Sequence, residues 1–221
     1  MENLKNYKNE YGFSNRHDTR RVVVYAFLAM FAVVFAFSTD ALIRGAIAGF
    51  FQNHKEISFF YDKITPVLNF IFHGTPQFTL AILILIIGRY RYPDYYIAGK
   101  TALLSLTFSG LAVQAVKHIT GRARPRVTDV FIAIGPTFRA GYDSFPSGHT
   151  ALAFSIAVLV TRYFPGFRAP AYFFAVLCAF HRVKTGSHFP SDVVAGAFAG
   201  VVVTSIIIYY FSDNKEVHDG G

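Results

Sequence analysis

The stretch HRVKTGSHFPSDVVAGAFAGVVVTSIIIYYF, residues 181–211, joins a basic, polar segment directly to a long apolar run. The run from about Ser191 to Phe211 can cross a bilayer as a helix, which takes about 20 residues. Pro190 favours a helix start at this point, because proline is well tolerated in the first helical turn. His188 and Asp192 would then lie one turn apart, where the polar segment meets the membrane.

Five further apolar runs extend this pattern along the chain. An uncleaved first span follows the polar head 1–21, and residues 40–77 mix charges with prolines, which predicts one or two short helices in the interface or packed on the bundle. The spans are expected at about Val22–Phe37, Thr75–Ile87, Ile97–Val116, Thr150–Tyr163, Ala171–Arg182 and Ser191–Phe211. The sequence therefore predicts an all-α, polytopic membrane protein: a six-transmembrane-helix bundle with a short interfacial helical segment between helices 1 and 2. We expect a single domain over 1–221, with a flexible tail at 212–221.

The composition supports a membrane protein. Hydrophobic residues make up 53% of the chain and charged residues only 15%, against about a quarter in soluble domains. The net charge of +8 could suggest nucleic-acid binding, but no such motif is present, and the basic residues fall in short polar stretches between apolar runs. They suit membrane topology and anionic ligands. The single cysteine, Cys178, lies in an apolar run and is interpreted as a packing residue.

Three segments bring cations and histidines to helix ends on one side of the predicted bundle. A charge at such a position is costly unless it is paired or functional. The segments are Lys117-HITGRA-Arg124-Pro125, Pro146-Ser147-Gly148-His149 and His181-Arg182-VKTGS-His188-FPS-Asp192. Their placement predicts one shared polar site.

The basic residues of these segments suit a phosphate group. A phosphoryl group in transfer carries negative charge on its oxygens, and catalysis is mostly positioning and charge stabilisation. Arg124 and Arg182 each offer a planar fork that can bind two oxygens, and Lys117 adds a point charge. Backbone N–H groups at Ser147 and Gly148, where a helix should begin, can point at an anion. We expect these five residues to bind phosphate.

Two histidines supply the remaining groups. Asp192 can accept a hydrogen bond from one ring nitrogen of His188 and leave the other unprotonated and aimed at phosphorus. His149, in the first turn of its helix, can protonate the leaving oxygen. The histidines and Asp192 could also suggest a metal site, but three neighbouring cations would repel a divalent ion. No metal or other cofactor is therefore expected.

These segments resemble the phosphatidic acid phosphatase type 2 superfamily, in its membrane lipid phosphatase branch. The family signature is Lys-x6-Arg-Pro, Pro-Ser-Gly-His and Ser-Arg-x5-His-x3-Asp; the first two match unchanged, and the third departs at His181, where the family usually has Ser. The resemblance implies a six-helix membrane fold, an active site on the outer face and a metal-free phosphohistidine mechanism. By matching position, it makes His188 the nucleophile, Asp192 its orienting group and His149 the acid. It makes phosphate ligands of Lys117, Arg124, Ser147, Gly148 and Arg182.

The expected reaction is hydrolysis of a phosphomonoester or pyrophosphate on a membrane lipid. Candidate substrates are phosphatidylglycerophosphate, phosphatidic acid, undecaprenyl pyrophosphate and a lipid A phosphate. A lipid-to-lipid phosphotransferase that uses the same site is a near alternative. A non-catalytic protein that binds or transports a lipid phosphate is a more distant one, since simple binding needs neither His149 nor Asp192. Soluble haloperoxidases of the same superfamily hold vanadate with such residues, and the membrane spans argue against that role. The oligomeric state stays open.

Membrane orientation depends on this site. Lys and Arg divide almost equally, eleven on the side of the termini and ten on the other, so the positive-inside rule alone does not decide. Because several of the ten are expected phosphate ligands, we place the termini in the cytoplasm. The active site would then lie on the outer, periplasmic face of the cell (inner) membrane.

Several polar residues have no motif role. A solvated surface is favoured for Arg122, Arg126, Arg139 and Lys184, although these residues could also attract an anionic substrate. His118, beside Lys117, could contact the phosphate-binding residues without touching the phosphate itself. The remaining histidines are interpreted as ordinary polar or interfacial residues: His17, His54, His73 and His218.

Overall fold

The structure is a computed structural model that describes residues 17–213. Within this range the chain forms seven α-helices and one short 3-10 helix, and no strand. They are α2 (His17–Asn53), α3 (Lys55–Ile71), α4 (Gly74–Tyr90), α5 (Pro93–Thr120), α6 (Gly148–Tyr163), η1 (Pro165–Phe167), α7 (Arg168–Lys184) and α8 (Pro190–Asp213). Residues 1–16 and 214–221, most of the expected head and tail, lie outside the described residues.

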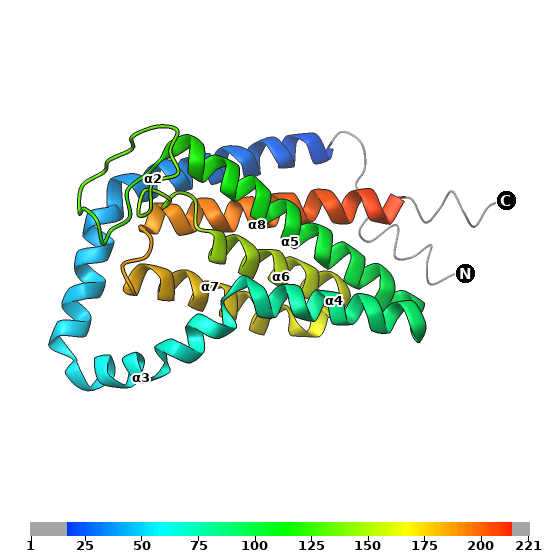
Figure 1. The fold of residues 1–221 in the computed structure, drawn as a ribbon. Coiled ribbons are helices and arrows are strands. Elements are labelled where there is room, and N and C mark those ends of the chain that lie inside the picture. The colour runs from blue at the N-terminus through cyan, green and yellow to red at the C-terminus, as the bar shows by residue number, and fades with distance from the viewer. Residues whose placement is uncertain (1–16, 214–221) are drawn as a thin grey trace.

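Helices α4 to α8 form an elongated bundle (Figure 1). α6 lies at its centre, in contact with α5, α7 and α8, and α4 packs along α5. The long loop 121–147 and the α7–α8 connection lie at the same end of the bundle (Figure 1). All three motif segments therefore meet at that end.

α2 differs from the sequence prediction. It does not stop near residue 37 but continues to Asn53, and Figure 1 shows its second half turning across the end of the bundle that holds loop 121–147. A break was expected because Asp40 and Arg44 interrupt the apolar run. Both charges are instead paired, Asp40 with Arg122 and Arg44 with Asp129, so the helix can continue. In the sequence, the second half of α2 and α3 cover most of residues 40–77, where one or two short interfacial helices were expected.

The structure does not confirm the expected six membrane spans. By length and hydropathy, three described helical stretches can cross a membrane: Val34–Asn53, Tyr95–Thr120 and Pro190–Tyr210. A fourth is added if α3 and α4, bent by 42° at their junction, count as one broken span. α6 and α7 have only 16 and 17 residues, less than the usual length of about 20. The described helices fit a membrane protein but do not confirm a six-span bundle.

Close packing of α6 on α8 positions the site. A Cβ atom on Gly200 would lie 2.1 Å from the Ala151 carbonyl oxygen, and one on Gly196 would lie 2.4 Å from the Ser147 oxygen. Only glycine allows this approach, as is common between membrane helices. The N-terminal ends of α6 and α8 are thereby held side by side. Cys178 is fully buried in an apolar cluster that α6 and α7 form with Phe72, as predicted.

Candidate active site

His188 lies in the α7–α8 connection and is 2% exposed. Its Nδ1 is 2.8 Å from the Ser144 carbonyl oxygen. A carbonyl only accepts hydrogen bonds, so Nδ1 carries the proton. Burial lowers the pKa of His188 to about 4, although nearby Asp192 opposes that shift. The ring is therefore neutral near pH 7, and its Nε2 keeps a free lone pair.

Asp192 lies in the first turn of α8 and is completely buried. Its Oδ2 accepts hydrogen bonds from the Phe189 backbone N–H, at 2.8 Å, and from the Ser144 hydroxyl, so it caps α8. The expected hydrogen bond from His188 is replaced: Oδ2 lies 3.6 Å from Nδ1, while the Ser144 carbonyl accepts the proton. The carboxylate is already engaged by other donors, which accounts for this difference.

Arg122 is the main residue that the sequence interpretation missed. It is not solvated surface but 2% exposed. Its Nη1 lies 2.5 Å from Asp192 Oδ1, and its Nη2 lies 2.7 Å from Asp40 Oδ2. Its guanidinium carbon is 4.6, 5.1 and 4.3 Å from the ring centroids of Phe37, Phe131 and Phe189. A buried Arg held between carboxylates and aromatic rings is a structural clamp.

Asp40 completes this clamp from α2. It accepts hydrogen bonds from the Ser191 backbone N–H, at 2.8 Å, and from the Ser191 hydroxyl, at 2.6 Å. Asp40, Arg122 and Asp192 thus join α2, the loop and the start of α8. One signal in the sequence could have found the clamp: an acidic residue between apolar residues needs a partner.

Two of the expected phosphate ligands are held by Asp143. Arg124 pairs with its carboxylate through Nε–Oδ1 at 2.8 Å and Nη2–Oδ2 at 2.5 Å, and Lys117 Nζ donates to its backbone carbonyl. Burial would raise the pKa of Asp143, but the Arg124 hydrogen bonds and the positive charges of Arg124 and Lys117 outweigh it and lower the pKa. Asp143, which sequence reasoning missed, therefore stays ionised and orients both cations.

Arg182, in the last turn of α7, is the third cation near this cluster. Its Nη1 lies 3.4 Å from Asn69 Oδ1, and its Nε is buried without a hydrogen-bond partner in the described part of the chain. It lies within electrostatic reach of Arg124, as does Lys117. The three cations are thus brought together, with donors left for an anion.

The N-terminus of α6 differs from expectation at Ser147. The Ser147 backbone N–H donates to the Asp192 carbonyl at 2.9 Å, and its hydroxyl accepts from Thr150. The N–H groups of Gly148 and His149 have no hydrogen-bond partner among residues 17–213. A Cβ on Gly148 would meet only Val113, at 3.6 Å. The fold itself therefore does not require glycine there, whereas close approach of a ligand would.

His149 lies in the first turn of α6, near the same cations. It lies within electrostatic reach of Arg182, His188 and Lys117. Its ring centroid is 5.8 Å from that of His73, in an edge-on arrangement. His73 is therefore a neighbour of the site, which sequence reasoning did not foresee.

His181 does not face the cluster. Its Nδ1 lies 2.7 Å from the Tyr61 hydroxyl, and its Nε2 lies 2.9 Å from Asn69 Oδ1. The same Oδ1 also accepts a hydrogen bond from Arg182 Nη1. Since Asn69 Oδ1 accepts, Nε2 donates and Nδ1 accepts from Tyr61. His181 therefore attaches α7 to α3.

The remaining polar residues near this end have separate partners. His118 Nδ1 lies 3.0 Å from the Thr137 carbonyl, and Lys184 pairs with Asp62 at 3.0 Å. Arg139 lies over Tyr142, and Arg126 is exposed. Within the described residues, no three His, Cys, Asp or Glu side chains converge to hold a metal ion.

Comparison with known proteins identifies the family. Residues 98–216 match the family model of the PAP2 superfamily. This match covers more than half of the chain and all three motif segments, so the chain belongs to the PAP2 superfamily, as the motifs predicted.

Two relatives have names that concern lipid phosphates. A Rhizobium etli protein named lipid A 1-phosphatase is 35% identical over 109 residues, which cover 46% of each chain. The Bacillus subtilis protein named undecaprenyl-diphosphatase BcrC is 39% identical over 118 residues, 52% of this chain and 56% of that protein. The chain thus spans about half the length of the curated relatives it matches.

A solved structure shares the fold. A transmembrane PAP2 type phosphatidylglycerolphosphate phosphatase from Bacillus subtilis superposes with a TM-score of 0.63 at 20% identity. The superposition covers 86% of this chain and 96% of the other. At this identity the likeness concerns the fold alone.

Proposed function

We propose that the protein hydrolyses a phosphomonoester or pyrophosphate on a membrane lipid, without a metal, through a phosphohistidine at His188. The observation that carries the proposal is the hydrogen bond from His188 Nδ1 to the Ser144 carbonyl, at 2.8 Å. It assigns the proton to Nδ1 and leaves Nε2 as a nucleophile. Lys117 and Arg182 interact electrostatically with His188, and Arg124 lies within reach of both of these cations.

The first step forms a bond between Nε2 and phosphorus and breaks the bond from phosphorus to the lipid oxygen. His149, which takes up a proton when the negatively charged phosphate binds beside it, donates that proton to the leaving oxygen. The attack places positive charge on the His188 ring, and Asp192 Oδ2, 3.6 Å from Nδ1, stabilises that charge. In the second step water attacks phosphorus, His149 takes its proton, and the P–N bond breaks to release inorganic phosphate and restore His188.

The phosphate oxygens are held by positive charge and by backbone N–H groups. Arg182, with a buried Nε that lacks a partner, and the N–H groups of Gly148 and His149 at the start of α6 supply open donors. Lys117 and Arg124 add charge from their positions on Asp143. Ser147 acts through its place at the start of α6, because its own N–H is already used.

The names of the relatives support a lipid phosphate as the substrate class. Those named proteins are a lipid A 1-phosphatase and an undecaprenyl-diphosphatase, and phosphatidylglycerophosphate and phosphatidic acid complete the candidates. The apolar helices support a site at a membrane surface. We place that site on the outer face, with the termini in the cytoplasm, and treat the chain as a single membrane-embedded domain.

The test is phosphate release by the purified chain in detergent, with each of the four lipid phosphates and with EDTA present. Wild type should release inorganic phosphate from at least one, and His188→Asn should release none. Phosphate recovered on a second lipid instead of in solution would indicate a phosphotransferase. Binding without turnover would indicate a non-catalytic lipid-binding protein. Activity that EDTA abolishes and a metal restores would contradict the proposed mechanism.

A further inference from the structure

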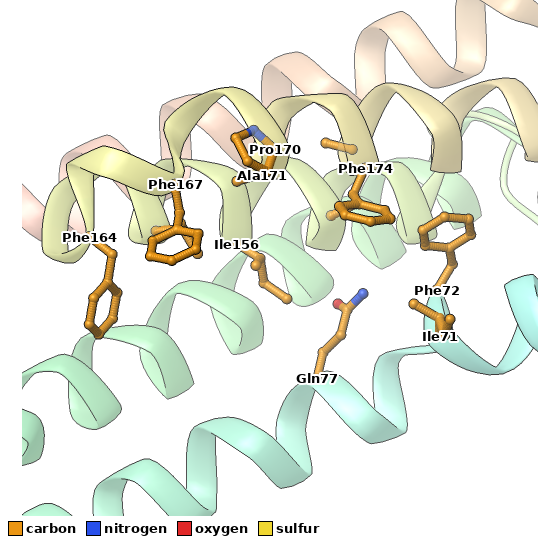
Figure 2. A pocket seen from close by; sticks show the side chains of 12 residues that line it. Ile71, Phe72, Gln77, Ile156, Phe164, Phe167, Pro170, Ala171 and Phe174 are labelled. Atoms are coloured by element: carbon orange, nitrogen blue, oxygen red, sulfur yellow. The ribbon is translucent and has the colours of Figure 1, made fainter.

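An apolar cavity of about 480 Å³ opens between α4, α6 and α7. Its walls are aliphatic and aromatic, with Ile156 on α6 and Phe174 on α7 facing the interior (Figure 2). Gln77 of α4 is the one polar side chain among its described lining residues, and Figure 2 shows its amide extending into the space. A polar group in such a place suits recognition of a particular ligand atom.

The cavity begins next to the candidate active site. His149 and the lining residues Ala153 and Ile156 recur at helical spacing along one face of α6. On α4, Gln77 follows His73 by four residues, about 6 Å along the helix, and the His73 ring lies 5.8 Å from that of His149. A lipid whose leaving oxygen met His149 would therefore place the atoms nearest its phosphate beside Gln77.

Gln77 is unsatisfied in this position. It is 8% exposed, and its Oε1 is buried without a hydrogen-bond partner in the described part of the chain. A buried polar atom without a partner is unfavourable. The amide carries an acceptor, Oε1, and donors on Nε2, so a group that offers both a donor and an acceptor can pair with both of its ends. A hydroxyl or a secondary amide does so, an ester offers only acceptors, and a prenyl chain offers neither.

We propose that Gln77 selects lipid phosphates that carry a hydroxyl or a secondary amide close to the phosphate, with their hydrocarbon chain in the α4–α6–α7 cavity. This proposal rests on the proposed lipid phosphatase function. It narrows the substrate class from any membrane lipid phosphate to N-acylated or hydroxylated ones. Polyprenyl phosphates fill the cavity but leave the Gln77 amide unpaired.

The test compares three substrates on the full chain in detergent. Ceramide 1-phosphate has an amide and a hydroxyl, phosphatidic acid has esters, and farnesyl phosphate has neither. Gln77→Met keeps the side-chain length and removes both polar groups. It should lower kcat/KM for ceramide 1-phosphate by roughly three- to tenfold and leave farnesyl phosphate unchanged or improved. Gln114→Met, at an exposed position on α5, should leave kcat/KM unchanged for both ceramide 1-phosphate and farnesyl phosphate.

Equal effects of Gln77→Met on all three substrates, or no effect on any, would overturn the proposal while leaving the phosphatase function intact. If wild type released phosphate from no lipid, the phosphatase function would fail instead. Thermal-shift titration with ceramide 1-phosphate is independent of turnover: wild type should bind it roughly three- to tenfold more tightly than Gln77→Met does. Equal binding by the two would reject the role of Gln77.

Discussion

Arg122 and Asp192 form a buried ion pair, with Arg122 Nη1 2.5 Å from Asp192 Oδ1 and neither side chain more than 3% exposed. The same guanidinium reaches Asp40, so one cation is shared by two carboxylates that are 152 residues apart in the chain (positions 40 and 192). The carboxylate that faces His188 is thus positioned by a residue at a position that the family signature leaves unspecified.

Replacing Arg122 should therefore affect both stability and activity. Arg122→Met leaves two carboxylates buried without their partner, and breaking a buried pair costs roughly 3–5 kcal/mol. We expect a lower thermal midpoint in detergent. A small displacement at a reacting group can cost about a hundredfold in rate, so we also expect phosphate release to fall by about a hundredfold.

Arg44→Met is the matched control for Arg122→Met. Arg44 pairs with Asp129, whose side chain is 85% exposed, and such pairs contribute about 0–1 kcal/mol. Its thermal midpoint should stay near that of wild type. If Arg122→Met proved as stable and active as Arg44→Met, the proposed clamp would have no role.

The helix ends that carry the motifs could be predicted from the sequence, because Pro190, Gly148 and the apolar runs are local signals. The lone acidic residue Asp40 indicates that a partner exists, but the sequence does not identify Arg122 as that partner, because Arg122 lies 82 residues from Asp40 and 70 from Asp192. Loop 121–147, which supplies Asp143 and Ser144, has no periodic pattern from which its path can be derived. Its course is fixed by backbone contacts such as Ser144 N to Arg122 O, at 3.0 Å.

The expected end of the first helix was wrong for a related reason. The charges at Asp40 and Arg44 were read as a break in the first helix, since a lone charge in an apolar run is unfavourable. Their partners come from the distant loop, through Arg122 and Asp129, so tertiary pairing overrides the local signal. His181 shows the same limit, because its partners Tyr61 and Asn69 lie on α3.

The His181 contacts predict a coupling between α7 and α3. Tyr61→Phe removes the hydrogen bond to His181 Nδ1, at 2.7 Å, and should cost about 0.5–1.5 kcal/mol. In a His181→Ser background the same change should cost much less, because the bond is already absent. Thermal unfolding of the four proteins of this cycle measures the difference. Additive effects of the two substitutions would show that the two residues do not interact.

Stability should depend on pH through His188. Its pKa is about 4 in the folded chain against 6.5 for the free side chain, so the unfolded state binds a proton first as the pH falls. The stabilising contribution of the neutral ring is therefore complete above pH 6.5 and is lost between pH 6.5 and 4.

His188→Asn provides the reference, because its amide can still donate to the Ser144 carbonyl but does not titrate. The difference in thermal midpoint between wild type and His188→Asn should be constant above pH 6.5. As the pH falls toward 4, the thermal midpoint of wild type should fall relative to that of His188→Asn. A difference that stays constant over this whole range would mean that His188 is not held in its neutral form.

Close packing of α6 and α8 predicts a steric effect at Gly200. Gly200→Ala would place a methyl group 2.1 Å from the Ala151 oxygen, and such overpacking costs about 1–3 kcal/mol. Gly110→Ala on α5, with no atom within 4 Å of the new methyl, should instead gain about 0.5–1 kcal/mol. Thermal unfolding in detergent checks both. Equal effects of the two would show that α6 and α8 do not approach as closely as described.

The phosphohistidine at His188 is the central claim, and trapping it is the most direct test. Purified chain is mixed with a ³²P-labelled lipid phosphate, quenched in alkali within the first turnover, and digested for mass spectrometry. Wild type should carry an alkali-stable, acid-labile phosphate on His188, and His188→Asn should carry none. Steady phosphate release by wild type with no label on the protein, or with label on another residue, would contradict the account.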